Sequence, residues 1–301
     1  MSIKLGIAPI AWSNDDMPEL GGDTSLEQCL KEASLAGFSG IESGGKFPKN
    51  SKELLPKLDK ENLQLCSGWY GAKLLTNTAK DELELMRNQL NLFKDCNAPC
   101  MVFAEITNSI QADPKIALSK KPKLSKDDWN KLILRMNEIS KMMLDENMPL
   151  AYHHHMGTVI ETEEETRRLI ENTNDSVRLL IDTGHMLFAQ GNSIKLVQDF
   201  SDRLIHVHCK DIRKEVDTVV EKIAPLQKEL EIIRKLRPRN SDIIIIDDLR
   251  LYAKDNYQNE NCGTRVTENI DWVVDLMGDK FGCLKSLEDE GYLVIVPHTD
   301  D

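Results

Sequence analysis

Short apolar runs alternate with longer amphipathic stretches through the first two thirds of the chain. The apolar runs read IKLGIAP, GFSGIES, LQLCSGW, PCMVFAEI, MPLAYHHH, RLLIDTGH and RLIHVHCK. Helical patterns lie between them at about 26–36, 52–61, 81–95, 126–146 and 163–171, with one more between the last two runs. This alternation is typical of βα units stacked into a parallel sheet.

About seven predicted strands precede residue 210, and no GxGxxG sequence follows the first of them to indicate a dinucleotide-binding sheet. The pattern therefore favours a TIM-type (β/α)8 barrel over a Rossmann domain. A long connection, NSIQADPKIALSKKPKLSKDD, follows the strand that ends at Glu105. Because long βα loops in barrels lie on the catalytic face, we expect this loop to help cover a site.

The pattern of apolar and polar residues changes after Arg213. A charged helix is predicted at about 216–236, followed by the run DIIIIDDL, a polar loop, a helix at about 268–277 and the run GYLVIVP. One strand, one helix and one strand are enough to supply the last strands of a barrel. We therefore expect residues 1–216 to form a barrel portion and residues 217–301 to form a divergent C-terminal βαβ segment that completes or abuts it.

Composition limits the classes of partner and the cellular compartment that we expect for the protein. The 301 residues carry a formal net charge of −12, which disfavours nucleic acid and anionic membrane surfaces and leaves a small molecule as the default partner. The seven cysteines show no CxxC spacing, and we read them as reduced thiols. Neither a signal peptide nor an apolar span of membrane length is present, so we expect a cytoplasmic protein. Assembly into a homo-oligomer is left open.

Six of the seven histidines fall at the ends of three predicted strands, and this is the strongest chemical signal in the chain. They are His153, His154, His155, His185, His206 and His208. Because the carboxyl ends of successive barrel strands meet at one mouth, we expect the three groups to be neighbours in space. A single histidine at such a place is more often a hydrogen-bonded strand-end residue, but three groups ending three consecutive strands favour a site.

Strand alternation limits which of these side chains enter one site. His153 and His155 are expected on one face and His154 on the other, whereas His206 and His208 share a face. Carboxylates lie nearby, since Asp182 precedes His185 in DTGH and Asp211 precedes Arg213 in KDIR. A mixed set of imidazoles and carboxylates suits Mn²⁺, Co²⁺, Fe²⁺ or Zn²⁺ and indicates a catalytic divalent site rather than a structural zinc.

Other polar and aromatic groups also end predicted strands. They are Trp12, Asn14 and Asp15 after the first strand, Glu42 after the second, Trp69 and Tyr70 after the third, and Glu105 after the fourth. Aromatic rings beside carboxylates suit a polyol or sugar ring, which has apolar faces and a rim of hydroxyls. Lys73, Lys121 and Lys210 are candidates to pair with a substrate oxyanion, with a solvated surface charge as the alternative for each.

Several long motifs in the same order resemble the inosose dehydratases, a family within the xylose-isomerase-like TIM barrels. They read GIAPIAWSNDDMPELGGDTSLEQCLKEASLAGFSGIESGGKFPK, LCSGWYGAKLL, AYHHHMGTVIET, LLIDTGHMLFAQG and RLIHVHCKDIR, and they span about residues 1 to 216. The resemblance implies a barrel fold, a divalent metal, most often Mn²⁺ or Co²⁺, and a polyol ketone as substrate.

The resemblance also implies a set of metal ligands. The positions that match the family's motifs are His153 or His155 on a middle strand, Asp182 in DTGH, and His208 in HVHCKD. The family's glutamate at the end of the last strand has no match, because Val296 and Pro297 stand there. The tail from about 223 weakly resembles the C-terminal part of Rossmann methyltransferase-like proteins, but it lacks their glycine-rich first half, so that activity does not follow.

The activity implied is that of a hydro-lyase, which removes water from 2-keto-myo-inositol (scyllo-inosose) to give a trihydroxycyclohexanedione. The predicted metal ligands are His153, Asp182 and His208. The predicted catalytic residues are Glu42, Glu105, His155, His185 and Arg213, with the acid and the base unassigned between them. The predicted substrate-binding residues are Trp12, Asn14, Trp69, Tyr70 and Lys210.

Two alternatives remain at this point. A ketose isomerase or epimerase on the same barrel would pass through a similar enediolate and return the proton differently. A catalytically impaired barrel that binds a polyol would follow from the missing fourth ligand. Asp247 and Asp248, which end the IIII run, could replace that ligand, although an aspartate pair after a buried strand is commonly a turn or a helix cap.

Overall fold

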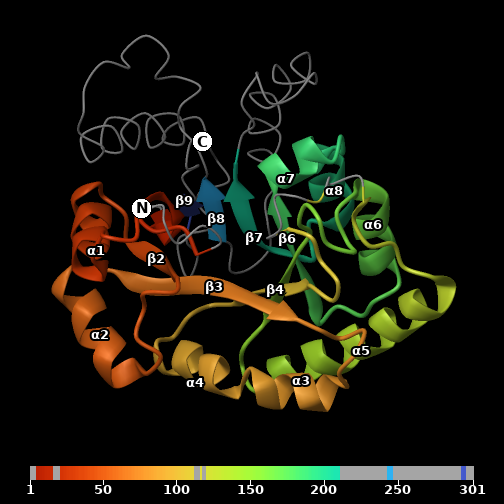
Figure 1. The fold of residues 1–301 in the computed structure, drawn as a ribbon, viewed down its shortest axis with the longest axis horizontal. Coiled ribbons are helices and arrows are strands. Elements are labelled where there is room, and N and C mark those ends of the chain that lie inside the picture. The colour runs from red at the N-terminus through yellow and green to blue at the C-terminus, as the bar shows by residue number, and fades with distance from the viewer. Residues whose placement is uncertain are drawn as a thin grey trace, which may run out of the picture.

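Seven parallel strands precede residue 210, and each overlaps one of the predicted apolar runs, although the third continues past its run to Ala72 and the sixth begins one residue earlier, at Val177. They are β1 (Leu5–Ile7), β2 (Gly40–Ser43), β3 (Gln64–Ala72), β4 (Met101–Glu105), β5 (Leu150–His153), β6 (Val177–Asp182) and β7 (Leu204–Cys209). The computed structural model describes residues 5–15, 21–111, 116 and 120–210, together with the backbone of 243–246 and 293–295. Figure 1 shows these strands as the central layer of the molecule.

Two further strands close the sheet into a parallel barrel in the order β1 to β9. β8 (Ile243–Ile246) pairs with β7, and β9 (Leu293–Ile295) pairs with β1, where Leu5, Gly6 and Ile7 face Leu293, Val294 and Ile295. The predicted TIM-type barrel is confirmed. Both closing strands come from the segment 217–301, whose boundary stays a prediction and whose other residues, including Asp247, Asp248, Val296 and Pro297, lie outside the described part of the chain.

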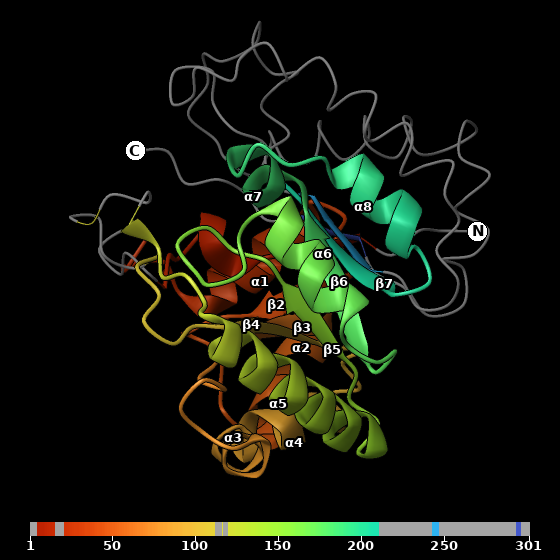
Figure 2. The ribbon, with the colours of Figure 1, turned by 90° about the vertical axis from the view of Figure 1, so that its right-hand side faces the viewer.

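Helices cover the outside of the barrel, as Figures 1 and 2 show. They are the short 3-10 helix η1 (Pro9–Ala11) and the α-helices α1 (Leu26–Leu35), α2 (Ser51–Lys60), α3 (Ala79–Leu85), α4 (Arg87–Asp95), α5 (Lys126–Asp145), α6 (Glu163–Glu171), α7 (Thr183–Phe188) and α8 (Ser193–Phe200). Their starts follow from the sequence, since Ser125 and Thr162 each form a capping box at the first turn of α5 and α6.

The structure also differs from the prediction at one helix and at the end of one strand. The single helix predicted at about 81–95 is two helices, α3 and α4, which meet at Met86. The run RLLIDTGH does not continue as a strand to His185, because β6 ends at Asp182 and α7 begins at Thr183. The Asp182 side chain accepts a hydrogen bond from the His185 backbone amide at 2.8 Å and so caps the new helix.

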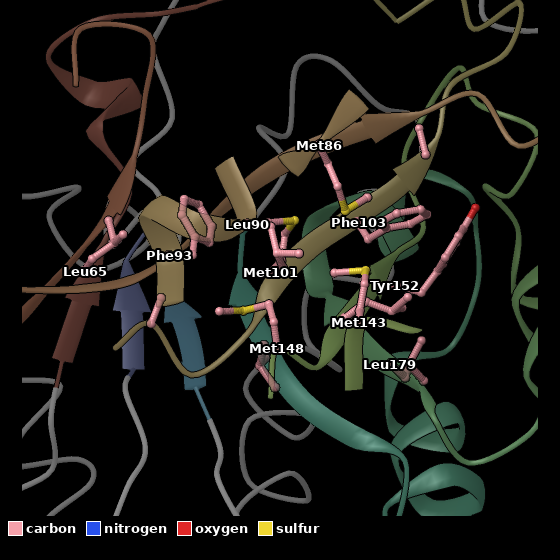
Figure 3. Close-up of a cluster of buried hydrophobic side chains, with 14 of the residues drawn as sticks. Leu65, Met86, Leu90, Phe93, Met101, Phe103, Met143, Met148, Tyr152 and Leu179 are labelled. Carbon is pink, nitrogen blue, oxygen red and sulfur yellow. The ribbon is translucent and has the colours of Figure 1, made fainter. Parts of the chain in front are cut away.

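The main hydrophobic core lies between the strands and the helices that cover them. Figure 3 shows part of it, where Phe93 of α4 and Phe103 of β4 pack among methionine and leucine side chains. Both rings are fully buried. A second, smaller apolar cluster includes Cys66, Cys100 and Leu180 and lies beneath the histidines described below. In the described part of the chain, no helix combines the length and apolar character that a membrane crossing requires.

Candidate active site

Four side chains from four strand ends meet at the mouth of the barrel. Glu42 comes from β2, His153 from β5, Asp182 from β6 and His208 from β7. Asp182 Oδ2 lies 3.3 Å from His153 Nε2 and 3.4 Å from His208 Nδ1, and the other nitrogen of His208 lies 3.4 Å from Glu42 Oε1. All four are buried. Residues separated by more than 160 positions are therefore in direct contact, as convergence of parallel strands predicts.

A second group of contacts lies deeper, around Glu42. Its carboxylate accepts a hydrogen bond from the Ser67 hydroxyl and lies 3.3 Å from His206 Nε2. His206 is fully buried, and its Nδ1 lies 3.5 Å from the Cys100 sulfur. Thus His206 and His208 share the inner face of β7, as their spacing predicts, with His206 deeper and His208 nearer the mouth.

A third group of side chains forms the outer wall of the site. The rings of His155 and His185 lie 3.8 Å apart between centroids, and the Trp69 ring stands edge-on to His155 and His153 at 5.3 and 5.4 Å. Lys210 Nζ lies 3.3 Å from both His185 Nε2 and Asp182 Oδ2. This wall combines an aromatic edge with imidazoles and an ammonium group.

His154 takes the opposite face from His153, as alternation predicts. Its Nε2 accepts a hydrogen bond from the Asp182 backbone amide at 3.2 Å, and the residue is fully buried. It supports the strand pair β5–β6 rather than the mouth. His155, one residue beyond β5, still reaches the site, and its Nδ1 lies 2.9 Å from the Met156 carbonyl oxygen.

Several predicted site residues are not brought to this cluster. Glu105 accepts hydrogen bonds from the backbone amides of Leu74 and Thr107, so its carboxylate holds two loops. The Tyr70 hydroxyl donates to Glu82 at 2.7 Å, and its ring lies beside Phe103 on the helix side of the sheet.

The remaining predicted residues either have partners away from the cluster or lie outside the described residues. The Trp12 indole donates to Glu32 of α1, while Asn14 is buried in the loop between β1 and α1. Lys121 pairs with Glu165 at 2.7 Å, which accounts for its charge without a substrate. Arg213 and Asp211 lie outside the described residues.

Sequence reasoning missed the part played by Ser67 and left His206 without a role. Ser67 stands two residues before Trp69 in LQLCSGW, and its hydroxyl contacts both Glu42 and His206. The only available signal was its position near the end of the predicted run LQLCSGW. A serine there is too common to indicate a buried contact with a residue on another strand.

The buried charges of the site stabilise one another. Burial alone would raise the pKa of Glu42, but the charges and hydrogen bonds of His208 and His206 outweigh it and hold the pKa well below its usual value. Burial would likewise raise the pKa of Asp182, and Lys210 and His185 reverse this. Burial would lower the pKa of His208, yet the two neighbouring carboxylates raise it. The two carboxylates thus favour the protonated form of the imidazole between them, and that imidazole favours their ionised forms.

The other histidines of the site are neutral. Burial lowers the pKa of His153 and His206 to about 4 and that of His154 to about 3. The pKa values of His155 and His185 are also lowered well below the usual value, mainly by burial, with further lowering by His153 at His155 and by His155 at His185. Each of these rings therefore keeps one unprotonated nitrogen at neutral pH.

Acidification is expected to destabilise the metal-free protein. His154 and His206 titrate near 3 and 4 when folded, against a usual value of 6.5, so the unfolded chain binds more protons between those limits and stability rises with pH across them. Moving from pH 6.5 to 5 should cost on the order of 2 kcal/mol for each such group. Thermal unfolding in the presence of a chelator measures this. His154→Gln, which keeps an acceptor for the Asp182 amide, should show a shallower pH dependence, and a flat profile in the unsubstituted protein would contradict the assignment.

The donor set at the mouth fits a divalent metal ion. Two groups have ligand atoms within 4.8 Å of one another, His153 with Asp182 and His208, and Glu42 with His206 and His208. Asp182 Oδ2 and both ring nitrogens of His208 are buried without a hydrogen-bond partner, although charged atoms lie 3.3–3.4 Å away. Buried polar atoms that converge without hydrogen bonding are costly unless another species satisfies them. Imidazole and carboxylate ligands together suit transition metals and zinc.

The sequence and the fold define the class of this protein. A family model described as xylose isomerase-like TIM barrel matches residues 30–255. The chain belongs to that family.

Two named relatives match the chain at higher sequence identity than the solved structures do. The chain is 36% identical over 265 residues to an inosose dehydratase of Bacillus anthracis, covering 85% of this chain and 87% of the relative. It is 41% identical over 216 residues to the rhizopine catabolism protein MocC of Rhizobium meliloti, covering 72% of this chain and 66% of that protein. These relatives support an enzyme.

Solved structures agree with the fold. An L-ribulose 3-epimerase matches with a TM-score of 0.60 and 15% identity, covering 95% of this chain and 96% of the other. The probable 3-DHS dehydratase AsbF of Bacillus anthracis matches with a TM-score of 0.56 and 13% identity, covering 97% and 92%. At these identities the likeness concerns the barrel alone.

Proposed function

We propose that the protein is a metal-dependent hydro-lyase that removes water from 2-keto-myo-inositol to give a trihydroxycyclohexanedione. The observation that carries the proposal is the convergence of His153, Asp182 and His208 at the barrel mouth. The relatives named inosose dehydratase supply the reaction class and the substrate. Residues 1–216 carry the site in this proposal, and residues 217–301 supply the strands that close the barrel.

His153, Asp182 and His208 hold the metal ion, which is Mn²⁺ or Co²⁺ in this proposal. When bound, such an ion stabilises the negative charge that develops on the ketone oxygen as the neighbouring carbon loses its proton. Lys210, 3.3 Å from Asp182 Oδ2, adds a second positive charge on the same side. The substrate ring lies against the edge of Trp69, which covers one apolar face of the polyol.

Proton transfer belongs to the pair of adjacent histidines at the outer wall. His155 and His185 are neutral, close together and beside the metal ligands, so one can accept the proton from the carbon next to the ketone. The β-hydroxyl leaves as water once it receives a proton, and the partner imidazole is placed to relay it. His185 Nε2 lies 3.3 Å from Lys210 Nζ, which orients that ring.

The test is metal content of the purified full chain, combined with an ultraviolet assay for dione formation from scyllo-inosose. The proposal expects product that depends on added Mn²⁺ or Co²⁺ and disappears with a chelator. Metal-dependent conversion of a ketose without loss of water would favour the isomerase or epimerase alternative. Folded protein that binds neither metal nor substrate would overturn the proposal and favour a barrel without activity.

A further inference from the structure

The His208 ring lies between two carboxylates that approach opposite nitrogens. Its Nδ1 is 3.4 Å from Asp182 Oδ2, and its Nε2 is 3.4 Å from Glu42 Oε1. A neutral imidazole carries one proton, so it presents one nitrogen as a donor and the other as a lone pair. Which carboxylate receives the donor decides which nitrogen is available to a metal ion.

The arrangement of the other ligands selects Nδ1 as the metal-binding nitrogen. His153 Nε2 lies 3.3 Å from the same Asp182 oxygen that faces His208 Nδ1, so the three candidate ligand atoms surround one point. A metal ion held by these three residues would bind His208 through Nδ1. The Nε2–H then points towards Glu42, on the other side of the ring.

Glu42 is held in place to receive that proton. The pairing of β2 with β3 shifts register between Ile41 and Glu42, so that Glu42 pairs with Ser67. Its carboxylate accepts a hydrogen bond from Ser67 and lies 3.3 Å from His206 Nε2, and only 6% of the residue is exposed. Ser67, His206 and His208 all face the same oxygen of this carboxylate, Oε1, and a carboxylate offers about four lone-pair positions over its two oxygens.

We propose that Glu42 is a positioning residue that accepts the Nε2–H of His208 and thereby fixes the tautomer and orientation in which Nδ1 binds the metal ion. Ser67 and His206 complete the arrangement by holding the carboxylate. The inference rests on the proposed function, because it requires a metal ion beside Asp182. It assigns Glu42 no contact with the substrate, in contrast to the catalytic role expected from the sequence.

The first test is the affinity of the protein for Mn²⁺. The 301-residue protein is freed of metal with a chelator and then titrated calorimetrically with Mn²⁺. Loss of a carboxylate that orients a metal-binding histidine typically weakens affinity 10–100-fold, and we expect that loss in Glu42→Ala. Glu42→Gln keeps an oxygen that can accept Nε2–H and should fall between Glu42→Ala and the unsubstituted protein. Glu82→Gln is the matched control, since Glu82 is a buried carboxylate that accepts side-chain hydrogen bonds from Tyr70 and Asn77 on the outer side of the sheet.

The tautomer itself provides a second test that a general loss of stability would not imitate. In the Zn²⁺-loaded protein, ¹⁵N NMR of the histidine rings should show His208 protonated at Nε2, and the Glu42→Ala signal should move or broaden. Circular dichroism confirms that each variant is folded, and Glu42→Gln replaces Glu42→Ala as the test variant if the latter is not.

The outcomes separate the inference from the proposed function. Two results would overturn the inference while leaving metal-dependent turnover intact. One is a Glu42→Ala variant whose metal affinity lies within threefold of that of the unsubstituted protein. The other is a His208 ring that is protonated at Nδ1 in the metal-loaded protein. An unsubstituted protein that binds no divalent ion would overturn both.

Discussion

Replacing Asp182 by asparagine is expected to remove metal binding and metal-dependent turnover while leaving the fold intact. Asp182 Oδ2 lies 3.3–3.4 Å from His153 Nε2, His208 Nδ1 and Lys210 Nζ, so the carboxylate joins the groups of the proposed site. Asparagine keeps the size of the side chain and its oxygen can still cap α7. The substitution therefore removes one negative charge and little else.

Loss of a residue that only orients a metal ligand typically weakens metal affinity 10–100-fold. We expect a larger loss here, because the substitution removes a ligand itself. Calorimetric titration of the metal-free protein and the dione assay measure binding and turnover separately. Asp128→Asn is the control, since Asp128 lies in the first turn of α5 and its side chain bonds Ser125 at the surface. Turnover of Asp182→Asn equal to that of the control would exclude Asp182 as a ligand.

Replacing Phe93 by alanine is expected to have the largest effect on stability. The ring is fully buried in the core between α4 and the sheet, as Figure 3 shows. The absence of a side chain at Gly68 makes room for it, because a Cβ there would lie 2.7 Å from the tip of the ring. Removing a buried phenylalanine typically costs about 3–5 kcal/mol through lost burial and the cavity left behind.

That cost is a large fraction of the roughly 5–15 kcal/mol that stabilises a typical domain. Thermal denaturation should shift downward on the order of 10 °C. Leu85→Ala in the neighbouring helix α3 is the matched control, because 67% of Leu85 is exposed and its loss should change stability by less than about 0.5 kcal/mol. Equal shifts in the two variants would mean that the Phe93 ring is not packed as the structure has it.

The apolar runs determined the strands because burial on both faces leaves a continuous hydrophobic signal. All seven strands before residue 210 overlap predicted runs, and α6 spans the predicted residues 163–171. The break at Met86 was not predictable, since the amphipathic pattern continues through it from α3 into α4. Periodicity reports which face is apolar and is less sensitive to where a helix is interrupted.

The candidate site was predicted in its centre and not at its edges. His153, Asp182 and His208 followed from strand ends and family motifs, and the structure brings them together. Trp69 and Tyr70 were both expected in the site, yet adjacent strand residues face opposite sides, and only Trp69 lies beside the histidines. Glu105 ends its strand as predicted, but its carboxylate accepts hydrogen bonds from the backbone amides of Leu74 and Thr107 in the neighbouring loops.

The sequence by itself determined the order of strands and helices, the end of the barrel that carries the chemistry, and the residue types gathered there. These properties depend on local pattern and on the common direction of parallel strands. Only the tertiary structure decided which carboxylate faces which nitrogen of His208, because Glu42 and Asp182 reach that ring from strands far apart in the chain. Contacts of this kind depend on register and barrel closure, which no local stretch of sequence encodes.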